Sequence, residues 1–190
     1  AAALDGLRRL MAVGIADELL AHYFLIERVA GVQRIDVQPV LKEIRDYLLR
    51  PDLRSAVFQA LDSEQASLRL FAYRLLEETP DRDLLYKAAS DRSPAIRLWL
   101  ARLLVQRHPP DCMDLCARLL HDRSSRVSTA TIAGLSSEQI ASMKNDLLNL
   151  IVADTRPVRE AVRYALRGTL IDFAAEARRR LVESRSDQIS

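Results

Sequence analysis

The residues best suited to bind a metal lie in one short stretch of the chain. Cys112 and Cys116 are four positions apart, which places both thiols on one face of an expected helix, and His121 follows them. Thiolate and imidazole are zinc ligands, but a structural zinc site usually has four ligands in a tighter pattern. We therefore expect no metal and no other cofactor, and we predict two buried, reduced cysteines that pack like small apolar residues.

The catalytic motifs that a single sequence can reveal are missing. The three histidines, His22, His108 and His121, are far apart in the sequence, and the five glycines are scattered. The chain contains no HExxH zinc-protease motif, no nucleophile elbow and no glycine-rich phosphate loop. We therefore predict that the protein is not an enzyme and has no catalytic residues.

Composition indicates a folded, soluble protein. Of its 190 residues, 49% are hydrophobic and 28% are charged, and a chain of this length buries roughly 70% of the surface that it exposes when unfolded. The most apolar stretch, LMAVGIADELLAHYFLIERVAG, contains four charged side chains, so we expect no membrane insertion. Two cysteines without a disulfide framework fit a reducing compartment, and we expect a cytoplasmic location.

Charge is distributed unevenly between the two halves of the chain. Residues 1–95 carry 13 Lys and Arg against 15 Asp and Glu, whereas residues 96–190 carry 15 against 11. The C-terminal half is therefore mildly basic. Because the chain has only three lysines, nearly all its positive charge comes from arginine, whose planar fork suits contacts with carboxylate or phosphate.

The elements that must position these side chains are helices. Apolar residues recur three and four positions apart, and no run of alternating β-branched residues is found. Breaks fall at RPD, TPD, HPPD and GLSSE. The pattern predicts helix pairs over 15–31 and 37–49, 53–60 and 64–78, 81–90 and 94–107, 111–121 and 125–135, and 137–153 and 157–168, flanked by a short first helix and a last helix near 170–185.

The second helices of the later pairs repeat one pattern. Each begins with an aliphatic residue, ends with a leucine and follows an aspartate, and the starting positions are 28, 31 and 31 residues apart. The starting residues are Leu68, Ile96, Val127 and Val158, the closing residues are Leu76, Leu104, Leu135 and Leu166, and the aspartates are Asp62, Asp91, Asp122 and Asp154. A period of this length predicts a solenoid of helical hairpins, in which each hairpin buries its apolar face against a neighbour.

This pattern resembles the HEAT-repeat family, whose units carry an Asp in the turn and then Val-Arg, small residues and a Leu. The third unit matches best at its turn, with Asp91, Ile96 and Arg97, and the fifth matches best in its helix, with Val158, Arg159, Ala165 and Leu166. Ser128 departs from the pattern, because it stands where an Arg is expected. The resemblance covers 62–168 clearly and 15–49 by rhythm.

The resemblance implies an all-α fold, a right-handed α-solenoid of about five hairpins similar to armadillo-type superhelices. We expect one domain over residues 1–190. Within it, 1–49 form atypical N-terminal helices, 53–168 form the repeats, and 170–185 form a C-terminal cap helix. The turn aspartate is suited to accept from the amides of the second helix, and the Arg is suited to reach the Asp of a neighbouring turn, which would form a ladder between repeats.

In HEAT-type arrays the second helices usually line the concave face. By register, one row contains Phe71, Trp99, Ala130 and Ala161, and another contains Arg74, Arg102, Ala133 and Tyr164. Trp99 and Arg102 lie on one helical face and are residue types that dominate many interfaces. We predict a partner-binding surface of Phe71, Arg74, Trp99, Arg102 and Tyr164. The alternative, that Phe71 and Trp99 fill space between hairpins, stays open.

Four arginines mark the last repeat at spacings of three, four and four: Arg156, Arg159, Arg163 and Arg167. We interpret this row as the polar outer face of a terminal repeat, with Asp172 and Glu176 of the next helix as partners. The alternative is that Arg159, Arg163 and Arg167 contact an acidic or phosphate-bearing ligand.

Three functions follow from the sequence, in decreasing order of support. The first is a non-enzymatic interaction or scaffold module that binds another protein, or another domain of the same chain, on its concave face. The second is a nucleic-acid-binding solenoid similar to the HEAT-like DNA glycosylases, which the near balance of acids and bases disfavours. The third is an enzyme built on HEAT repeats, such as a metal-dependent hydroxylase or a bilin lyase; its expected His-Glu pairs are absent.

Overall fold

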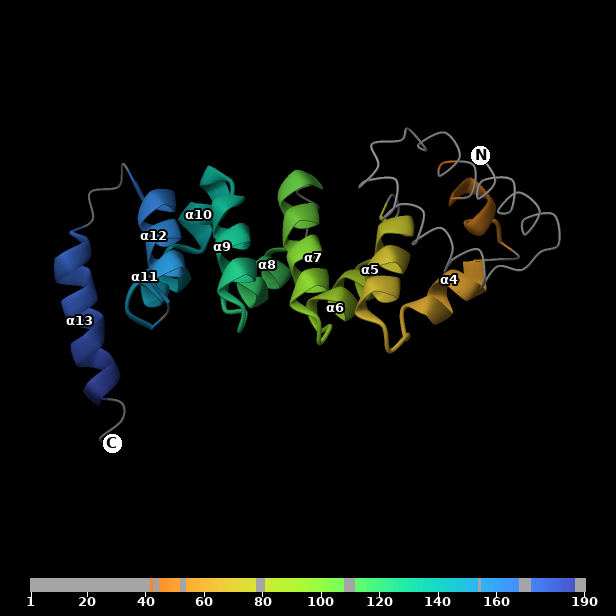
Figure 1. Ribbon diagram of the computed structural model, residues 1–190. Coiled ribbons are helices and arrows are strands. Elements are labelled where there is room, and N and C mark those ends of the chain that lie inside the picture. Colours follow the sequence, from red (N-terminus) through yellow and green to blue (C-terminus); the bar gives the residue numbers. More distant parts are fainter. Residues whose placement is uncertain are drawn as a thin grey trace, which may run out of the picture. The chain divides into compact units, whose positions relative to one another are not determined.

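The computed structural model describes residues 42, 45–51, 54–77, 81–107, 112–153, 155–167 and 172–186. Within these ranges every regular element is a helix and no strand is present, so the predicted all-α solenoid is confirmed (Figure 1). The predicted helix over 15–31 lies outside the described residues, and the one over 37–49 lies largely outside them. The chain separates into two compact units, Ala1–Leu84 and Leu85–Ser190. One domain over residues 1–190 stays a prediction.

The helices follow the predicted hairpin order, usually within two or three residues of the expected boundaries. They are α4 (Arg54–Ala60), α5 (Ala66–Leu75), α6 (Arg82–Ala89), α7 (Pro94–Arg107), α8 (Met113–Leu120), α9 (Ser125–Ala133), α10 (Ser137–Ser142), α11 (Lys144–Ala153), α12 (Arg156–Ala165) and α13 (Phe173–Ser186). In the first unit, α4 packs against α5.

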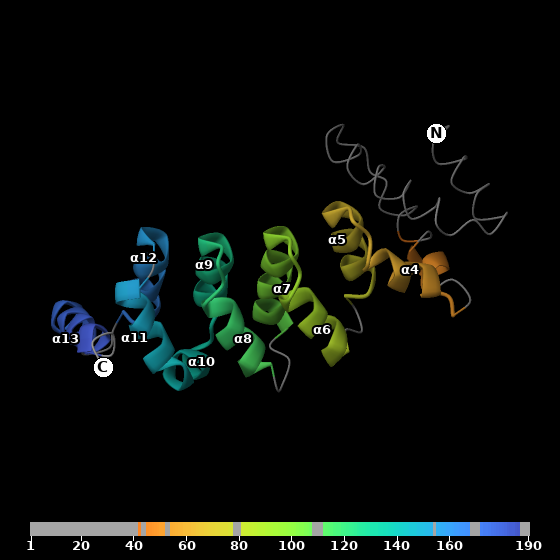
Figure 2. The ribbon, with the colours of Figure 1, turned by 90° about the horizontal axis from the view of Figure 1, so that it is seen from below.

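The second unit has two layers of helices. In Figure 2, α7, α9 and α12 stand side by side in one layer, and α8, α10 and α11 form the other. Contacts join α7 to α9 and α9 to α12 within the first layer, and α8 to α9 and α11 to α12 across the layers. Helix α13 packs against α11. Helix α9 therefore lies between the second helices of the hairpins before and after it, as a solenoid requires.

The core of the second unit lies between these layers, because α7, α8, α9, α11 and α12 each turn one aliphatic stripe inward. Buried side chains recur three and four positions apart on both layers. On α7, α9 and α12 they include Ile96, Leu100, Leu104, Val127, Ile132, Val158 and Val162, and on α8 and α11 they include Leu115, Leu119, Leu147, Leu148 and Ile151.

Local sequence signals start and end these helices. Helix α7 begins at Pro94, whose fixed φ and missing N–H suit a first turn. Helix α10 begins with a capping box, in which the Ser136 hydroxyl accepts from the Gln139 amide at 3.2 Å and the Gln139 side chain accepts from the Ser136 amide at 2.9 Å. Gly134 ends α9 against α7, where the side chain of Val105 leaves no room for a methyl group.

One predicted helix is two helices in the structure. The sequence predicts a single helix over 137–153, but α10 ends at Ser142, Met143 forms a turn and α11 begins at Lys144. Helix α10 has no buried residue, whereas Met143 and the following leucines of α11 are buried. The chain therefore changes direction where its apolar stripe begins, because only α11 has a face that can pack into the core.

Candidate functional site

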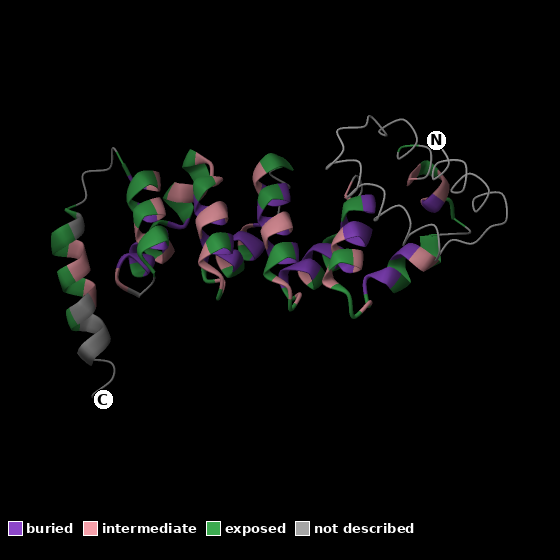
Figure 3. Cartoon of the chain, in the orientation of Figure 1, coloured by how far each residue is buried: buried purple, intermediate pink, exposed green. Residues whose placement is uncertain are grey.

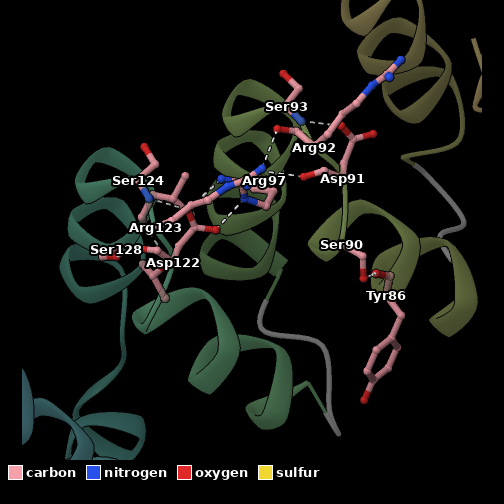
Figure 4. A network of polar contacts seen from close by, with 12 residues as sticks. Tyr86, Ser90, Asp91, Arg92, Ser93, Arg97, Asp122, Arg123, Ser124 and Ser128 are labelled. Atoms are coloured by element: carbon pink, nitrogen blue, oxygen red, sulfur yellow. Dashed lines mark hydrogen bonds and ion pairs between the residues drawn. The ribbon is translucent and has the colours of Figure 1, made fainter. Parts of the chain in front are cut away.

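Arg97 joins two consecutive inter-helix turns in the second unit (Figure 4). Its Nε donates to Asp122 Oδ2 at 2.6 Å and its Nη2 donates to Asp122 Oδ1 at 3.0 Å. Its Nη1 donates to the backbone oxygen of Asp91 at 2.7 Å. One guanidinium thus holds the turn before α7 and the turn before α9, so the predicted Asp–Arg ladder is confirmed for this pair of repeats.

The turns themselves are built by the aspartates. Asp91 Oδ1 accepts from the Ser93 amide at 2.7 Å, and Asp122 Oδ1 accepts from the Ser124 amide at 2.8 Å. A second link joins the same two turns in the opposite direction, because Arg123 Nη2 donates to the backbone oxygen of Arg92 at 3.0 Å. Positions 92 and 123 are one period of 31 apart, so equivalent points of adjacent repeats are bonded directly.

Burial makes the Arg97–Asp122 ion pair strong and costly to disturb. The two side chains are 5% and 6% exposed. The hydrogen bonds to Asp122 raise the pKa of Arg97 above its usual value, against the opposing effect of burial, and the negative charges of Asp122 and Asp91 add to the rise. Arg97 therefore stays charged, and its charge is neutralised within the protein.

Ser128 occupies the position that Arg97 holds one repeat earlier. Its hydroxyl donates to the backbone oxygen of Asp122 at 3.1 Å, which reproduces the contact of Arg97 with the carbonyl of its own turn. A serine has no guanidinium and forms no ion pair, so the departure seen in the sequence removes the charged half of the ladder at this repeat. Asp154, the next turn aspartate, lies outside the described residues.

The surface beside the ladder is hollowed. An open hollow of about 320 Å³ lies at the turns, and its walls include Asp91, Arg97, Asp122, Arg118 and Arg123. Both carboxylates already accept hydrogen bonds from backbone amides. Arg118 is exposed and, among the described residues, makes no hydrogen bond or ion pair.

Helices α7, α9 and α12 share one exposed face, which we call the second-helix face. Its members are exposed residues seven positions apart on each helix and 31 apart between helices: Ala95 and Arg102, Arg126 and Ala133, Pro157 and Tyr164. The half-buried residues Trp99, Ala130 and Ala161 lie between them. Figure 3 shows exposed and intermediate residues along these three helices, on the side opposite the buried stripe.

The structure separates the two predicted rows. Arg102, Ala133 and Tyr164 are all exposed, and Tyr164 at 62% is the most exposed aromatic side chain among the described residues. Arg74 is exposed on α5 of the first unit. Phe71 is 3% exposed, so its ring packs in the core, which favours the space-filling alternative at that position.

The arginine row on α12 divides among different environments. Arg156 pairs with Glu160 on the same helix at 2.8 Å. Arg159 is half-buried at the register position of Arg97, and Arg163 and Arg167 are exposed. The guanidinium of Arg167 lies over the Tyr164 ring at 3.8 Å from its centroid.

The predicted partners of this row are wrong. Asp172 Oδ1 accepts from the amides of Ala174 and Ala175 and caps α13. Glu176 pairs with Arg179 at 2.7 Å and Arg180 at 2.6 Å on its own helix, and the hydrogen bonds to these arginines lower its pKa to about 2. Both acids are thus bound locally, Asp172 by amides two and three residues further on and Glu176 by arginines three and four residues further on.

The two cysteines are free and buried, as predicted. Burial is the main cause that raises the pKa of Cys116 to about 11, and the negative charges of Cys112 and Asp114 add to it. His121 is exposed and therefore does not share their environment. Among the described residues, no group of three or more His, Cys, Asp or Glu side chains is placed to hold a metal. His22 and His108 lie outside those residues.

Sequence reasoning missed Arg126 as a member of the second-helix face. The signal was present, because residue 126 lies seven positions before Ala133 and 31 after Ala95. A face on a straight helix returns after seven residues, so each exposed row implies a second row one heptad earlier.

Residues 82–167 match the family model of HEAT repeats. This segment contains α6 to α12, the ladder and the second-helix face, and we assign it to the HEAT-repeat family. HEAT repeats generally mediate protein–protein interaction or scaffolding and are typically non-enzymatic. No curated protein and no solved structure matches the chain. Among the described residues, no helix is both long and apolar enough to cross a membrane.

Proposed function

We propose that this chain is a non-enzymatic interaction module that binds another protein, or another domain of the same chain, on the second-helix face. The observation that carries the proposal is the exposure of Tyr164, at 62%, in register with Arg102 two repeats earlier. Large aromatic side chains expose apolar area at a cost, and a binding partner recovers that cost by covering them.

The composition of this face supports the same function. Tyrosine and arginine are among the residues that most often dominate binding energy, and here they stand on helices whose opposite sides are buried in the core. The helices hold the backbone of the face rigid, so a partner loses little free energy in ordering it. Trp99, which is half-buried on the same face of α7, adds partly exposed aromatic surface beside Arg102.

Of the remaining predicted contact residues, some would contact the partner directly and others contribute through the structure. Arg163 and Arg167 lie beside Tyr164 at the edge of the second-helix face, so an acidic group of a partner that extends past Tyr164 would meet them there. Arg74, which is exposed on α5, stays a predicted contact within the first unit. Phe71 and Arg159 contribute through packing and through the ladder register, respectively, rather than by direct contact.

The test begins with the partner that the intact chain captures from the lysate of its source, identified by mass spectrometry and then purified. Its affinity is measured for the wild type, for Arg102→Ala and for Tyr164→Ala. We expect each variant to weaken binding at least about tenfold, equivalent to about 1.4 kcal/mol. Thermal unfolding should change little, because both side chains are exposed.

Arg118→Ala is the matched control. Arg118 is also an exposed arginine in the second unit, but it lies on α8 in the other layer. Its loss should leave the affinity within about twofold of the wild type. If Arg102→Ala and Tyr164→Ala bind as tightly as the control, the second-helix face is not the binding surface.

A further inference from the structure

Charge in the second unit is segregated by layer. Helices α7, α9 and α12 carry three, one and three arginines, against a single carboxylate, Glu160. Helices α8, α10 and α11 of the other layer carry Arg118 and Lys144 against Asp114, Glu138 and Asp146. The near-zero charge of the whole chain therefore hides a strongly basic layer beside a slightly acidic one.

Internal partners account for part of this positive charge. Arg97 is buried in the ladder with Asp122, and Arg156 pairs with Glu160. Arg107 is exposed and Arg159 is half-buried, but both interact within the protein, which leaves three further exposed arginines on the layer: Arg102, Arg126 and Arg163. Among the described residues these three make no hydrogen bond or ion pair. Arg102 and Arg126 therefore present forked sets of donors on the second-helix face, and Arg163 presents one at its edge, at the register position of the buried Ala101 and Ile132.

We propose that the partner of the second-helix face is an acidic polypeptide segment, a proposal that rests on the interaction function proposed above. Helices packed side by side are about 8 to 10 Å apart, and an extended chain advances about 3.3 Å per residue. A segment that crosses α7, α9 and α12 therefore meets a new helix about every third residue. Glutamate or aspartate near that spacing would reach Arg102 and Arg126 on the second-helix face and Arg163 at its edge, while Tyr164 covers an apolar side chain.

The same observations disfavour a nucleic acid. Proteins that bind nucleic acid through its backbone typically neutralise about six to ten phosphates, whereas this face offers two arginines without internal partners, with Arg163 at its edge and Arg167 stacked on Tyr164. Arg167 covers one face of the Tyr164 ring, so that face is not open to a nucleobase. Carboxylates spaced along a peptide match the sparse arginines better than a continuous phosphate backbone does.

The experiment measures binding of a fluorescent polyglutamate peptide to the intact chain by anisotropy. One variant carries Arg102→Gln and Arg126→Gln on the second-helix face. The matched control carries Arg118→Gln and Lys144→Gln on the other layer, so both variants lose two exposed cations and have the same net charge. A single-stranded DNA oligonucleotide with the same number of negative charges as the peptide is the competing probe.

We expect the face variant to lose at least about tenfold in polyglutamate affinity and the control to change by less than about twofold. Wild-type affinity should fall as salt rises from about 0.05 to about 0.2 M, because screening weakens exposed charge pairs. Equal losses in both variants would overturn the proposal in favour of non-specific attraction. Tighter, face-dependent binding of the oligonucleotide would assign the face to nucleic acid instead.

This result is independent of the test of the interaction function. If Tyr164→Ala weakens the captured partner while the face variant binds polyglutamate like the control, the interaction module stands and its acidic partner is refuted. If Arg102→Ala and Tyr164→Ala leave the captured partner's affinity unchanged, the interaction function itself fails, whatever polyglutamate does.

Discussion

Arg97→Ala should lower the free energy of unfolding of the second unit more than the control substitution Arg123→Ala does. Arg97→Ala deletes three hydrogen bonds at once, two to the Asp122 carboxylate and one to the backbone oxygen of Asp91. It also leaves Asp122, whose side chain is 6% exposed, without its countercharge. The substitution therefore removes the ion pair that joins two repeats and leaves the buried Asp122 carboxylate without a partner of opposite charge.

The magnitude follows from burial. Breaking a buried ion pair by removing one partner costs about 3 to 5 kcal/mol, because the remaining charge stays desolvated. Exposed ion pairs are worth about 0 to 1 kcal/mol. Asp122 keeps its hydrogen bond from the Ser124 amide at 2.8 Å, which offsets part of the loss and places our expectation near the lower end, at about 3 kcal/mol.

Denaturant unfolding followed by far-ultraviolet circular dichroism measures the loss. Arg123→Ala is the control, because this exposed arginine makes a single hydrogen bond to the same neighbouring turn, and we expect it to cost less than about 1 kcal/mol. A double-mutant cycle with Asp122→Ala should give a coupling energy of at least about 1 kcal/mol between Arg97 and Asp122. Equal free energies of unfolding for Arg97→Ala and Arg123→Ala would refute the ladder as a source of stability.

Three further predictions concern packing, reactivity and pH. Gly134→Ala should lower the free energy of unfolding by about 1 to 3 kcal/mol because its methyl group overlaps Val105, and a denaturation midpoint equal to that of the wild type would contradict this. Cys116, whose pKa burial raises to about 11, should resist alkylation at neutral pH until the chain unfolds, which mass spectrometry checks; rapid labelling of the native protein would show that the thiol is accessible. Glu176 has its pKa lowered from 4.5 to about 2 by hydrogen bonds to its helix neighbours, so the stability it adds to α13 is present above about pH 4.5 and is lost as pH falls toward about 2. Nuclear magnetic resonance should show that Glu176 titrates near pH 2, and an ordinary glutamate midpoint would disprove the pairing.

The repeat period carried most of the correct predictions. Because each repeat adds 31 residues, one register fixes equivalent positions in α7, α9 and α12. Placing Arg102, Ala133 and Tyr164 at one register position was enough to predict a common row, and all three are exposed. The ladder was predictable for the same reason, since a turn Asp and an Arg recur at fixed offsets.

Ion pairs between neighbours on one helix were harder to predict than positions that follow from the repeat period. The sequence offered Glu176 to the arginines of α12, but Arg179 and Arg180 lie three and four residues away on the same helix. Such neighbours lie close together in any helix, so they pair with the Glu176 carboxylate unless the fold prevents it. The turn at Met143 was hidden in a similar way, because no Gly or Pro marks it and the cause is the lack of an apolar stripe on α10.

Burial of single side chains and charge by layer were invisible in the linear sequence. Phe71 and Trp99 share a register position, yet one is buried and the other half-buried, because burial depends on the neighbour that covers each ring. Charge counted along the two halves of the chain averages first and second helices together. The basic layer emerges when residues are sorted by helix, which requires the hairpin assignment first.

Arginine has two separable roles on α7, and helix geometry decides which residue takes which. Arg97 and Arg102 are five residues apart, and at about 100° per residue they point about 140° apart around the helix axis. The first is therefore turned to the neighbouring turn and buried, and the second to the exposed face. Loss of Arg97 should reduce the folded fraction but leave the affinity of the folded molecules intact, whereas loss of Arg102 should reduce affinity and leave stability intact. The ladder and the second-helix face can thus change independently, because a HEAT-type repeat places the residues that hold the array together and those that meet a partner on different sides of one helix.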